Sequence, residues 1–336
     1  MSAIHQIQID RFGTAETLGL SQTAAPAGIE HDEVQIAVNF SGINFADIQM
    51  RLGFYPDAPK KPFVPGYEVS GIVKKIGPNV THVNVGDPVV AGTYFGGYAS
   101  QVTVPAHQVF PLPQSMSLAE GAALPVNFFT AHLALFEMAR IRPGDRVLIE
   151  GATGGVGTMA VQMAKAVGAE ITGLTSSRDK LAYIEALGAT AFMREEFEGN
   201  PKLTGYDFIL NSTGGPSIKA QRQRLAITGR MVCMGLSSGV KDGRRNFFRL
   251  GLAAMRTARI GVFGLMDSNS GIFGLNALHV LEDEEWVTRL TQSLDRVEEL
   301  NLRPHVDTVF PADKVSDAHR HLETKAARGK VLLAWQ

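Results

Sequence analysis

The sequence predicts an α/β protein in two parts, and three observations lead to that class. Residues 1–110 carry short apolar-polar alternations separated by Gly, Pro, Asn and Asp, which is typical of a strand-rich domain. From residue 146 onward, strand and helix signals alternate, which is typical of a parallel sheet covered by helices. A glycine-rich turn joins the first of these strands to the first helix. With 336 residues the chain is long enough for two hydrophobic cores.

The N-terminal region begins its strand pattern clearly at "EVQIAVNF", where Val34, Ile36, Val38 and Phe40 share one face. The stretches "YEVSGIVKKIG", "DPVVAGT" and "YASQVTVP" follow at short intervals and predict a small barrel or a curled sheet. The segment 117–139 is rich in Ala and Leu and predicts helix. Ser117 and Glu120 stand three apart at its start, as in a capping box.

The second region alternates regularly. Apolar runs predict strands at 146–150, 170–174, 206–212 and 230–236, with helices ending near 167, spanning 178–187 and lying near 216–226. Residues 278–300 predict one acidic amphipathic helix whose apolar face holds Val287, Leu290, Leu294 and Val297. The tail returns to strand, helix and strand.

Composition excludes several classes of protein. The net charge of −1 gives no sign of nucleic-acid binding. The one cysteine, Cys233, permits neither an intrachain disulfide nor a zinc site built from cysteines. The N-terminus does not resemble a signal or transit peptide, and no apolar run reaches the ~20 residues of a spanning helix. We therefore expect a soluble, cytoplasmic protein.

The glycine-rich turn predicts a phosphate site. Residues 152–157, Ala-Thr-Gly-Gly-Val-Gly, follow the dinucleotide-binding pattern G-x-G-x-x-G with alanine in the first place. Backbone N–H groups of Gly154, Gly155 and Val156 are expected to face a pyrophosphate at the start of the helix. The alternative is a structural turn without a ligand.

The end of the second strand favours NADP(H) over NAD(H). An NAD site places Asp or Glu there, to accept from the ribose 2′-hydroxyl. This strand ends instead in Thr175 and Ser176, followed by Arg178 and Lys180, which suit a 2′-phosphate. In the alternative interpretation Ser177 caps the next helix while Arg178 and Lys180 are solvated, and both interpretations can hold together.

At this point several segments resemble the zinc-free medium-chain dehydrogenase/reductase superfamily, in its quinone oxidoreductase group and the vesicle amine transport protein homologue branch. The matching segments are "GINFADIQMRLGFYP" (42–56), "PFVPGYEVSGIVKKIGPNVTHVNVGDPVV" (62–90), "IRPGDRVLIEGATGGVGTMAVQMAKAVGA" (141–169) and "RGKVLLA" (328–334). The resemblance implies a GroES-like β-barrel catalytic domain over 1–123 and 301–336, and a Rossmann domain with a doubly wound parallel sheet over 124–300. It further implies a cofactor and a substrate that meet between the domains, and a homodimer formed through an edge strand near 258–266.

The resemblance also indicates whether the chain has the zinc ligands of its metal-dependent relatives. Zinc-dependent relatives place ligands at positions that align with Asn44 and Tyr67, and neither residue supplies a thiolate or an imidazole. We expect no metal site. His319 and His321 stand two apart on a predicted helix and are taken as surface residues.

Three residues are the catalytic candidates that the resemblance implies. Asn44 would lie by the nicotinamide ribose and carboxamide, with Asp47 on the same short helical turn. Tyr55 would donate a hydrogen bond to the oxygen that gains charge as hydride arrives. The alternatives are that Tyr55 is a packing aromatic and that Asp47 only braces its turn.

The resemblance places further residues near the cofactor. They are Thr130, Arg194, Ser212, Thr213, Met234, Gly235, Leu236 and Lys330. Two departures from the family pattern stand out: Phe192-Met193-Arg194 lacks the Tyr that often precedes the Arg, and Gln49 replaces a Tyr found in many quinone reductases.

These observations predict a zinc-independent enzyme that transfers hydride from NADPH to a quinone or an α,β-unsaturated carbonyl compound. The alternative is an NADPH-binding scaffold or a peripheral membrane protein with little turnover, because 241–259 is basic and amphipathic. We favour burial of that apolar face within the protein over membrane contact.

Overall fold

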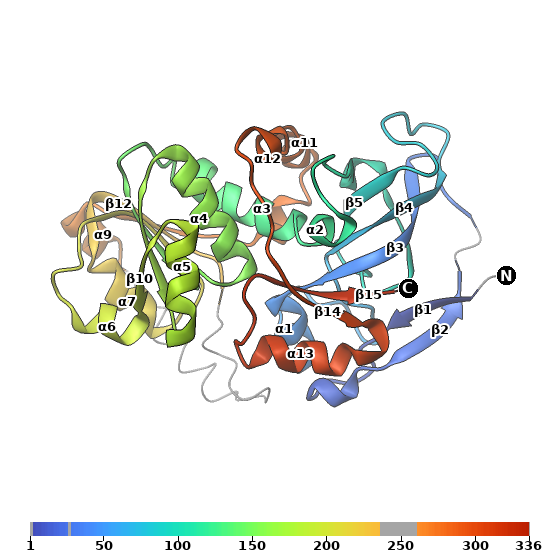
Figure 1. Ribbon diagram of the computed structural model, residues 1–336, viewed down its shortest axis with the longest axis horizontal. Coiled ribbons are helices and arrows are strands. Elements are labelled where there is room, and N and C mark those ends of the chain that lie inside the picture. The colour runs from blue at the N-terminus through green and yellow to red at the C-terminus, as the bar shows by residue number, and fades with distance from the viewer. Residues whose placement is uncertain (1–2, 26–27, 236–260, 336) are drawn as a thin grey trace. The chain divides into compact units, whose positions relative to one another are not determined.

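The computed structural model describes residues 3–25, 28–235 and 261–335. These residues form two compact units (Figure 1). Unit 1 comprises the described residues up to Val126 and those from Val280 onward, and unit 2 comprises the described residues between Asn127 and His279. The chain therefore leaves unit 1, builds unit 2 and returns to unit 1.

Unit 1 is built mainly from strands. They are β1 (Ala3–Ile7), β2 (Leu20–Ala24), β3 (Glu33–Ile43), β4 (Glu68–Ile76), β5 (Pro88–Gly92), β6 (Gln101–Pro105), β7 (Val109–Pro111), β14 (Val306–Pro311) and β15 (Lys330–Ala334). Seven of them form one sheet in the order β14-β15-β3-β4-β5-β7, with β6 paired to β3, and β1 pairs with β2. β14 and β15 are parallel, while β3 pairs antiparallel with β4, β6 and β15. The prediction of a curled, strand-rich domain is confirmed.

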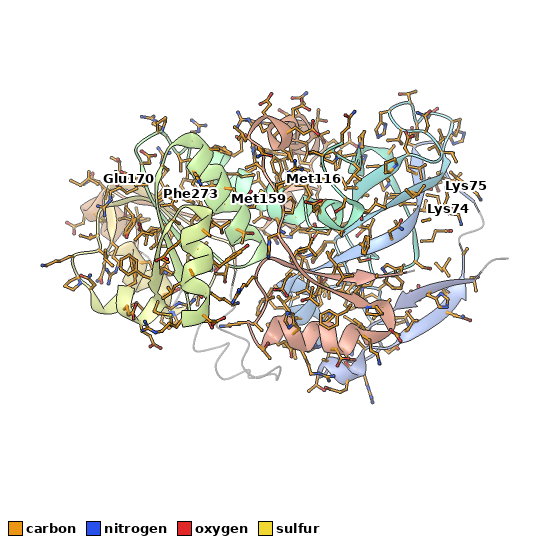
Figure 2. All side chains as sticks on the ribbon, in the orientation of Figure 1. Lys74, Lys75, Met116, Met159, Glu170 and Phe273 are labelled. Carbon is orange, nitrogen blue, oxygen red and sulfur yellow. The ribbon has the colours of Figure 1, made fainter. Side chains whose placement is uncertain are left out.

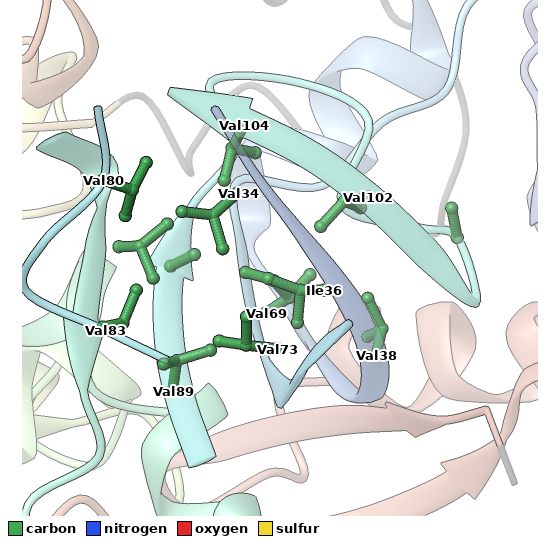
Figure 3. Close-up of a cluster of buried hydrophobic side chains, with 13 residues drawn as sticks. Val34, Ile36, Val38, Val69, Val73, Val80, Val83, Val89, Val102 and Val104 are labelled. Carbon is green, nitrogen blue, oxygen red and sulfur yellow. The ribbon is translucent and has the colours of Figure 1, made fainter. Parts of the chain in front are cut away.

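The core of unit 1 follows from the alternation in β3. Val34, Ile36 and Val38 are at most 1% exposed, and they pack against Val69 and Val73 of β4 (Figure 3). Each such side chain contributes about 1.5–3 kcal/mol by its burial.

Phe40 leaves that face, although the sequence pattern places it there. The ladder between β3 and β4 is irregular between Val38 and Phe40, and Phe40 packs against Ala122, Ala123 and Leu332 instead. A bulge of this kind shifts the residues beyond it to a different neighbour set.

The helices of unit 1 are short. They are η1 (Ala15–Thr17), α1 (Phe45–Leu52), η2 (Ala106–Gln108), α2 (Leu118–Ala122), α11 (Glu284–Gln292), α12 (Asp295–Glu299), η6 (Ala312–Lys314) and α13 (Val315–Glu323). The predicted capping box is confirmed at α2, where Glu120 N donates to Ser117 Oγ and Ser117 N donates to Glu120 Oε2.

The single helix predicted over 278–300 is wrong. The chain forms α10 (Ala277–Val280), α11 and α12 instead. The carboxylate of Asp283 accepts hydrogen bonds from the backbone N–H groups of Glu285 and Trp286, so a new helix begins there. Val287, Leu290 and Val297 are nevertheless buried, as the amphipathic pattern predicts.

Unit 2 is a parallel sheet covered by helices. Its strands are β8 (Arg146–Glu150), β9 (Glu170–Thr175), β10 (Thr190–Met193), β11 (Tyr206–Asn211), β12 (Leu225–Cys233) and β13 (Gly271–Gly274). Its helices are α3 (Pro125–His132, whose first two residues belong to unit 1), η3 (Leu133–Met138, a π-helix), α4 (Gly155–Val167), η4 (Arg178–Lys180), α5 (Leu181–Leu187), α6 (Arg194–Gly199), α7 (Pro216–Arg222) and α9 (Val262–Ser268). Figure 1 shows α4 and α5 beside the strands that they contact.

The order of the strands in unit 2 is β10-β9-β8-β11-β12-β13, with every pair parallel. Numbered within this sheet, the order is 3-2-1-4-5-6, that of a doubly wound dinucleotide-binding sheet. The strand order reverses between β8 and β11. Ligands bind in such sheets beyond the carboxyl ends of the strands at that reversal.

The strand predicted at 230–236 is β12 (Leu225–Cys233), which begins within the range of the helix predicted near 216–226. Two further details of unit 2 differ from the sequence prediction. The short strand β10 has no counterpart in it. The predicted edge strand near 258–266 is also wrong in its described part, because residues 262–266 lie in α9 and the edge strand is β13, which carries Phe273 (Figure 2). Four residues give too short an alternation to identify a strand from sequence.

Candidate functional site

The glycine loop of unit 2 lies at the reversal of strand order. It leaves β8 at Glu150 and enters α4 at Gly155. The hydroxyl of Ser212, just beyond β11, donates to the backbone carbonyl of Glu150 at 3.0 Å, so the carboxyl ends of the two strands are joined here. This is the position at which a parallel sheet of this order holds a ligand.

The glycines of the loop serve two different needs. A Cβ on Gly157 would lie 2.1 Å from the carbonyl oxygen of Gly151, and one on Gly155 would lie 2.5 Å from Oδ1 of Asn127. Packing within the protein therefore requires glycine at both positions. A Cβ on Gly154 would have its nearest neighbour, the Gly151 carbonyl, at 3.5 Å, which is ordinary contact. Glycine at 154 instead leaves room for a group outside the chain to approach the backbone.

The loop also offers unpaired donors. Gly155, Val156 and Gly157 are the first three residues of α4, and N–H groups at these positions have no acceptor within a helix. The positive end of the helix dipole lies at the same place. Together these features could hold an anion, and they fit the pyrophosphate of a dinucleotide.

The residues after β9 present hydroxyl and cationic groups. Thr175 is buried, and its Oγ1 accepts from Ser177 N at 3.2 Å, whereas Ser176 is exposed. The hydroxyl of Ser177 donates to Asp179 and makes no helix-capping bond.

The two cations beyond β9 have different surroundings. The side chain of Arg178 is 73% exposed and pairs with Glu196 at 2.5 Å. Lys180 is only 4% exposed. The solvated alternative therefore describes Arg178 and not Lys180, because only the former side chain extends into water.

Arg194 contacts groups that follow two different strands. Its Nε lies 3.1 Å from Oε1 of Glu150, and its Nη2 donates to Oγ1 of Thr213 at 3.0 Å. Glu150 is fully buried. Sequence reasoning did not single out Glu150, although an acid that follows three apolar residues at the end of a strand is a visible signal.

Further predicted cofactor residues collect at the same end of the sheet. The backbone N–H of Met234 donates to the carbonyl of Asn211 at 3.0 Å, and a Cβ on Gly235 would lie 2.8 Å from the carbonyl of Ser212. Thr130 is buried on α3, one turn beyond Asn127, the residue that packs against Gly155. Leu236 lies outside the described residues, as does the basic stretch 241–259.

Unit 1 holds the second group of predicted residues, centred on the turn from Asn44 to Asp47. The carboxylate of Asp47 accepts from Asn44 N at 2.7 Å, from Gly66 N at 3.2 Å and from the hydroxyl of Tyr98 at 3.1 Å. Burial raises the pKa of Asp47 to about 7, although these bonds and the charge of Lys330 act in the opposite direction. Asp47 therefore braces the turn and ties it to the segment before β4.

A buried chain of side chains continues from Asp47. Arg51 can only donate, so its contact of 3.3 Å makes Nδ1 of His319 an acceptor and places the ring proton on Nε2. Nε2 lies 3.2 Å from the hydroxyl of Tyr98, which donates to Asp47. Glu323 pairs with Arg51 at the other end.

The expectation that His319 lies on the surface is therefore wrong. His319 is fully buried, and burial followed by the charge of Arg51 holds its pKa well below the usual range. His321, two residues later, is partly exposed and pairs with Asp307 at 2.7 Å. The spacing correctly separated the two side chains, but the packing of α13 against η1 and β15 decided which one is covered.

The carboxamide of Asn44 contacts a buried ion pair. Lys330 donates from Nζ to Asn44 Oδ1 at 2.6 Å, Asn44 Nδ2 donates to Glu68 Oε1 at 3.1 Å, and Lys330 and Glu68 form an ion pair. The side chains of Lys330 and Glu68 are 4% and 0% exposed. Sequence reasoning missed Glu68, because a strand pattern does not show which groups a side chain contacts in the folded protein.

Tyr55 belongs to an aromatic cluster. Its ring centre lies 6.4 Å from that of Tyr67, which lies 5.4 Å from that of Phe95. Burial raises the pKa of both tyrosine hydroxyls, so both remain protonated donors at neutral pH. The hydroxyl of Tyr67 is shielded from solvent and makes no hydrogen bond of normal geometry with any residue that the structure describes.

No group of three or more His, Cys, Asp or Glu side chains within the described ranges could hold a metal ion. Within the same ranges, no helix is both long and apolar enough to cross a membrane.

Comparison with known proteins agrees with this architecture. The alcohol dehydrogenase GroES-like domain model matches residues 30–114, and the zinc-binding dehydrogenase model matches residues 187–333. The synaptic vesicle membrane protein VAT-1 homolog of Rattus norvegicus is 30% identical over an alignment of 332 residues, which covers 96% of this chain and 82% of the relative.

Two solved structures extend the comparison. Quinone oxidoreductase of Escherichia coli complexed with NADPH has a TM-score of 0.84 at 26% identity, over 98% of this chain and 100% of the other. The CurK enoyl reductase has a TM-score of 0.81 at 27% identity, over 98% and 99%. The chain belongs to the medium-chain dehydrogenase/reductase superfamily of oxidoreductases, in the quinone oxidoreductase group and the branch of the VAT-1 homologues.

Proposed function

We propose that this protein is an NADPH-dependent, zinc-independent reductase of quinones or α,β-unsaturated carbonyl compounds. The observation that carries the proposal is the glycine loop at the strand-order reversal, with Gly154 open to a ligand and the N-terminus of α4 behind it. The NADPH complex of the E. coli quinone oxidoreductase supports the choice of cofactor.

In this proposal unit 2 binds the cofactor. The N–H groups at the start of α4 hold the pyrophosphate. Cationic and hydroxyl groups at or just after the ends of β9, β10 and β11 receive the 2′-phosphate and the ribose. These groups are Thr175, Ser176, Arg178, Lys180, Arg194, Ser212 and Thr213. Arg194 is partly neutralised by Glu150, so its contribution to 2′-phosphate affinity is smaller than that of an unpaired guanidinium.

Unit 1 supplies the groups that act on the substrate. When bound, NADPH supplies the hydride. The carbonyl oxygen of a quinone or enone gains negative charge as hydride arrives, and a side-chain N–H of Asn44 and the hydroxyl of Tyr55 donate hydrogen bonds to it. Zinc independence rests on the residues at the metal-ligand positions of the zinc enzymes, Asn44 and Tyr67, which are poor zinc ligands.

The test is the steady-state loss of reduced-nicotinamide absorbance with NADPH or NADH against ortho-quinones, para-quinones and enones. We expect turnover with preference for NADPH, and a loss of about 10- to 100-fold in kcat/KM for Tyr55→Phe. Tyr94→Phe is the matched control, because the hydroxyl of Tyr94 already binds Glu282. Preference for NADH would contradict the cofactor assignment, and no turnover with any acceptor would contradict the enzyme assignment.

We also propose a homodimer through the edge of unit 2. Val262, Phe263 and Met266 of α9 are 69%, 86% and 64% exposed, and β13 is the edge strand beside β12. Exposed apolar side chains near a strand edge that no described residue pairs with are typical of an interface. Sedimentation velocity should show a dimer that Phe263→Glu converts to a monomer.

A cytoplasmic location without membrane contact remains part of the proposal. The VAT-1 homologue of the rat is named a synaptic vesicle membrane protein, so the alternative of a peripheral membrane protein has its own test. Sedimentation with anionic vesicles should leave the protein in the supernatant. Binding that is lost at high salt would support the alternative.

A further inference from the structure

The Asn44 carboxamide is held at both of its polar atoms by groups of opposite character. Its carbonyl oxygen accepts from the Lys330 ammonium at 2.6 Å, and its amide nitrogen donates to Glu68 Oε1 at 3.1 Å. An ammonium can only donate and a carboxylate can only accept. A flipped carboxamide would place N–H against the ammonium and C=O against the carboxylate, so one orientation is strongly favoured.

Glu68 itself has little freedom to move. Its Oε1 receives both Lys330 and Asn44, while its Oε2 accepts from the backbone N–H of Val126 at 2.8 Å, at the start of α3. A carboxylate at a helix N-terminus is favoured by the unpaired N–H groups there. The side chain is fully buried. Three donors from three separate segments therefore fix one carboxylate.

The result is a single uncommitted donor. Asn44 Nδ2 carries two hydrogens, and one of them is used by Glu68. No described residue accepts the other. Asn44 is only half-buried, so this N–H remains open to a ligand.

We propose that Glu68 and Lys330 are positioning residues that fix the Asn44 carboxamide with one N–H presented to the substrate or cofactor oxygen. The inference rests on the proposed function for the role of that N–H. The orientation of Asn44 can be tested without it. In this account Lys330 acts through Asn44, because its ammonium is buried against Glu68 and Asn44.

The opposing account is that Lys330 and Glu68 only stabilise unit 1. Glu68→Gln separates the two accounts, because a Gln has one acceptor oxygen for the three donors that now share two. Its NH₂ must face either Val126 N–H or the Asn44–Lys330 side, and both placements oppose donor to donor.

The first experiment follows the Asn44 amide directly, by NMR of protein labelled with ¹⁵N at asparagine and free of cofactor. Asn44→Ala identifies the side-chain resonances by their loss. We expect Glu68→Gln to shift and broaden them, while Glu323→Gln, which neutralises another carboxylate of unit 1 away from the amide, leaves them in place. Unchanged resonances in Glu68→Gln would overturn the inference whether or not the protein turns over.

The second experiment is a double-mutant cycle on turnover and thermal stability. Glu68→Gln should lower kcat/KM by about 10- to 100-fold in the wild-type background and by about twofold or less in the Asn44→Ala background. Its lowering of Tm should be similar in both. A purely structural pair would instead lower kcat/KM by the same factor in both backgrounds. If the wild type shows no turnover, the proposed function fails while the NMR result still decides the inference.

Discussion

Two ion pairs, one from each unit, differ in how deeply they are buried. In unit 1, Lys330 and Glu68 are 4% and 0% exposed and share their hydrogen bonds with Asn44. In unit 2, Arg178 and Glu196 are 73% and 46% exposed and belong to a surface pair. Because the first pair is buried, breaking it is costly and its neighbours are held in one arrangement. Water screens the charges of the second pair. A buried pair can hold a neighbouring side chain in place. The cation of an exposed pair can leave its carboxylate and bind a phosphate instead.

The largest expected effect is the loss of one member of the buried pair. Lys330→Met leaves the Glu68 carboxylate buried without its cation and should lower the free energy of unfolding by about 3–5 kcal/mol. The double variant Glu68→Gln, Lys330→Met should regain much of that loss, because no unpaired charge remains. Urea denaturation measures both. A loss below about 1 kcal/mol for Lys330→Met would show that water reaches the pair.

Next in size is the pH dependence caused by Asp47. Burial raises its folded-state pKa from 3.8 to about 7, so between those values the unfolded chain releases a proton that the folded chain retains. Stability is then lost as pH rises, by up to about 1.4 kcal/mol per pH unit. The stability difference between wild type and Asp47→Asn should decline from pH 4 to pH 7. Parallel curves would mean that the three donors to Asp47 already offset its burial.

Two glycines of the glycine loop should respond differently to substitution by alanine. Gly157→Ala places a methyl group 2.1 Å from the Gly151 carbonyl and should lower stability by about 1–3 kcal/mol. Gly154→Ala has room and should leave the Tm of the cofactor-free protein almost unchanged. We expect Gly154→Ala to weaken NADPH binding about tenfold or more, measured by nicotinamide fluorescence. Unaltered affinity would imply that no ligand approaches position 154.

The smallest effect on stability belongs to the exposed pair. Arg178→Ala should change the free energy of unfolding by less than about 1 kcal/mol. Its effect on the cofactor should be specific: about tenfold weaker NADPH binding with NADH binding unchanged. Glu196→Gln releases the guanidinium and should strengthen NADPH binding, more so at low salt. Equal changes for NADPH and NADH would assign Arg178 to a part of the cofactor that both share.

Much of the parallel sheet was predictable from residue order. The runs at 146–150 and 206–212 each hold three consecutive apolar residues, as strands covered on both faces do, and the runs at 146–150, 170–174 and 206–212 are each followed by a helical period. The short strand β10 was not predictable, because four residues carry too little pattern. The break between α10 and α11 depends on Asp283 accepting from Glu285 N and Trp286 N, which competes with continued helix.

The candidate site residues also differ in whether the sequence could predict them. The glycine loop is one short stretch of sequence, so its glycines and the helix after it could be identified from a few consecutive residues. Asn44, Glu68 and Lys330 lie 24 and 262 residues apart along the chain, and their contact depends on β15 pairing with β3. His319 shows the same limit, since its burial depends on α13 packing against η1 and β15.

By itself the sequence determined the fold class, the glycine loop between β8 and α4, and the polar character of the residues after each strand, because those properties arise from neighbours within a few residues. Tertiary structure alone decided that Lys330 and Glu68 fix the carboxamide of Asn44, that Asp47 braces the turn through Gly66 and Tyr98, and that Arg178 remains in water. The physical reason is that burial sets the strength of the electrostatic interactions that a charged group makes, and burial is a property of the packed chain.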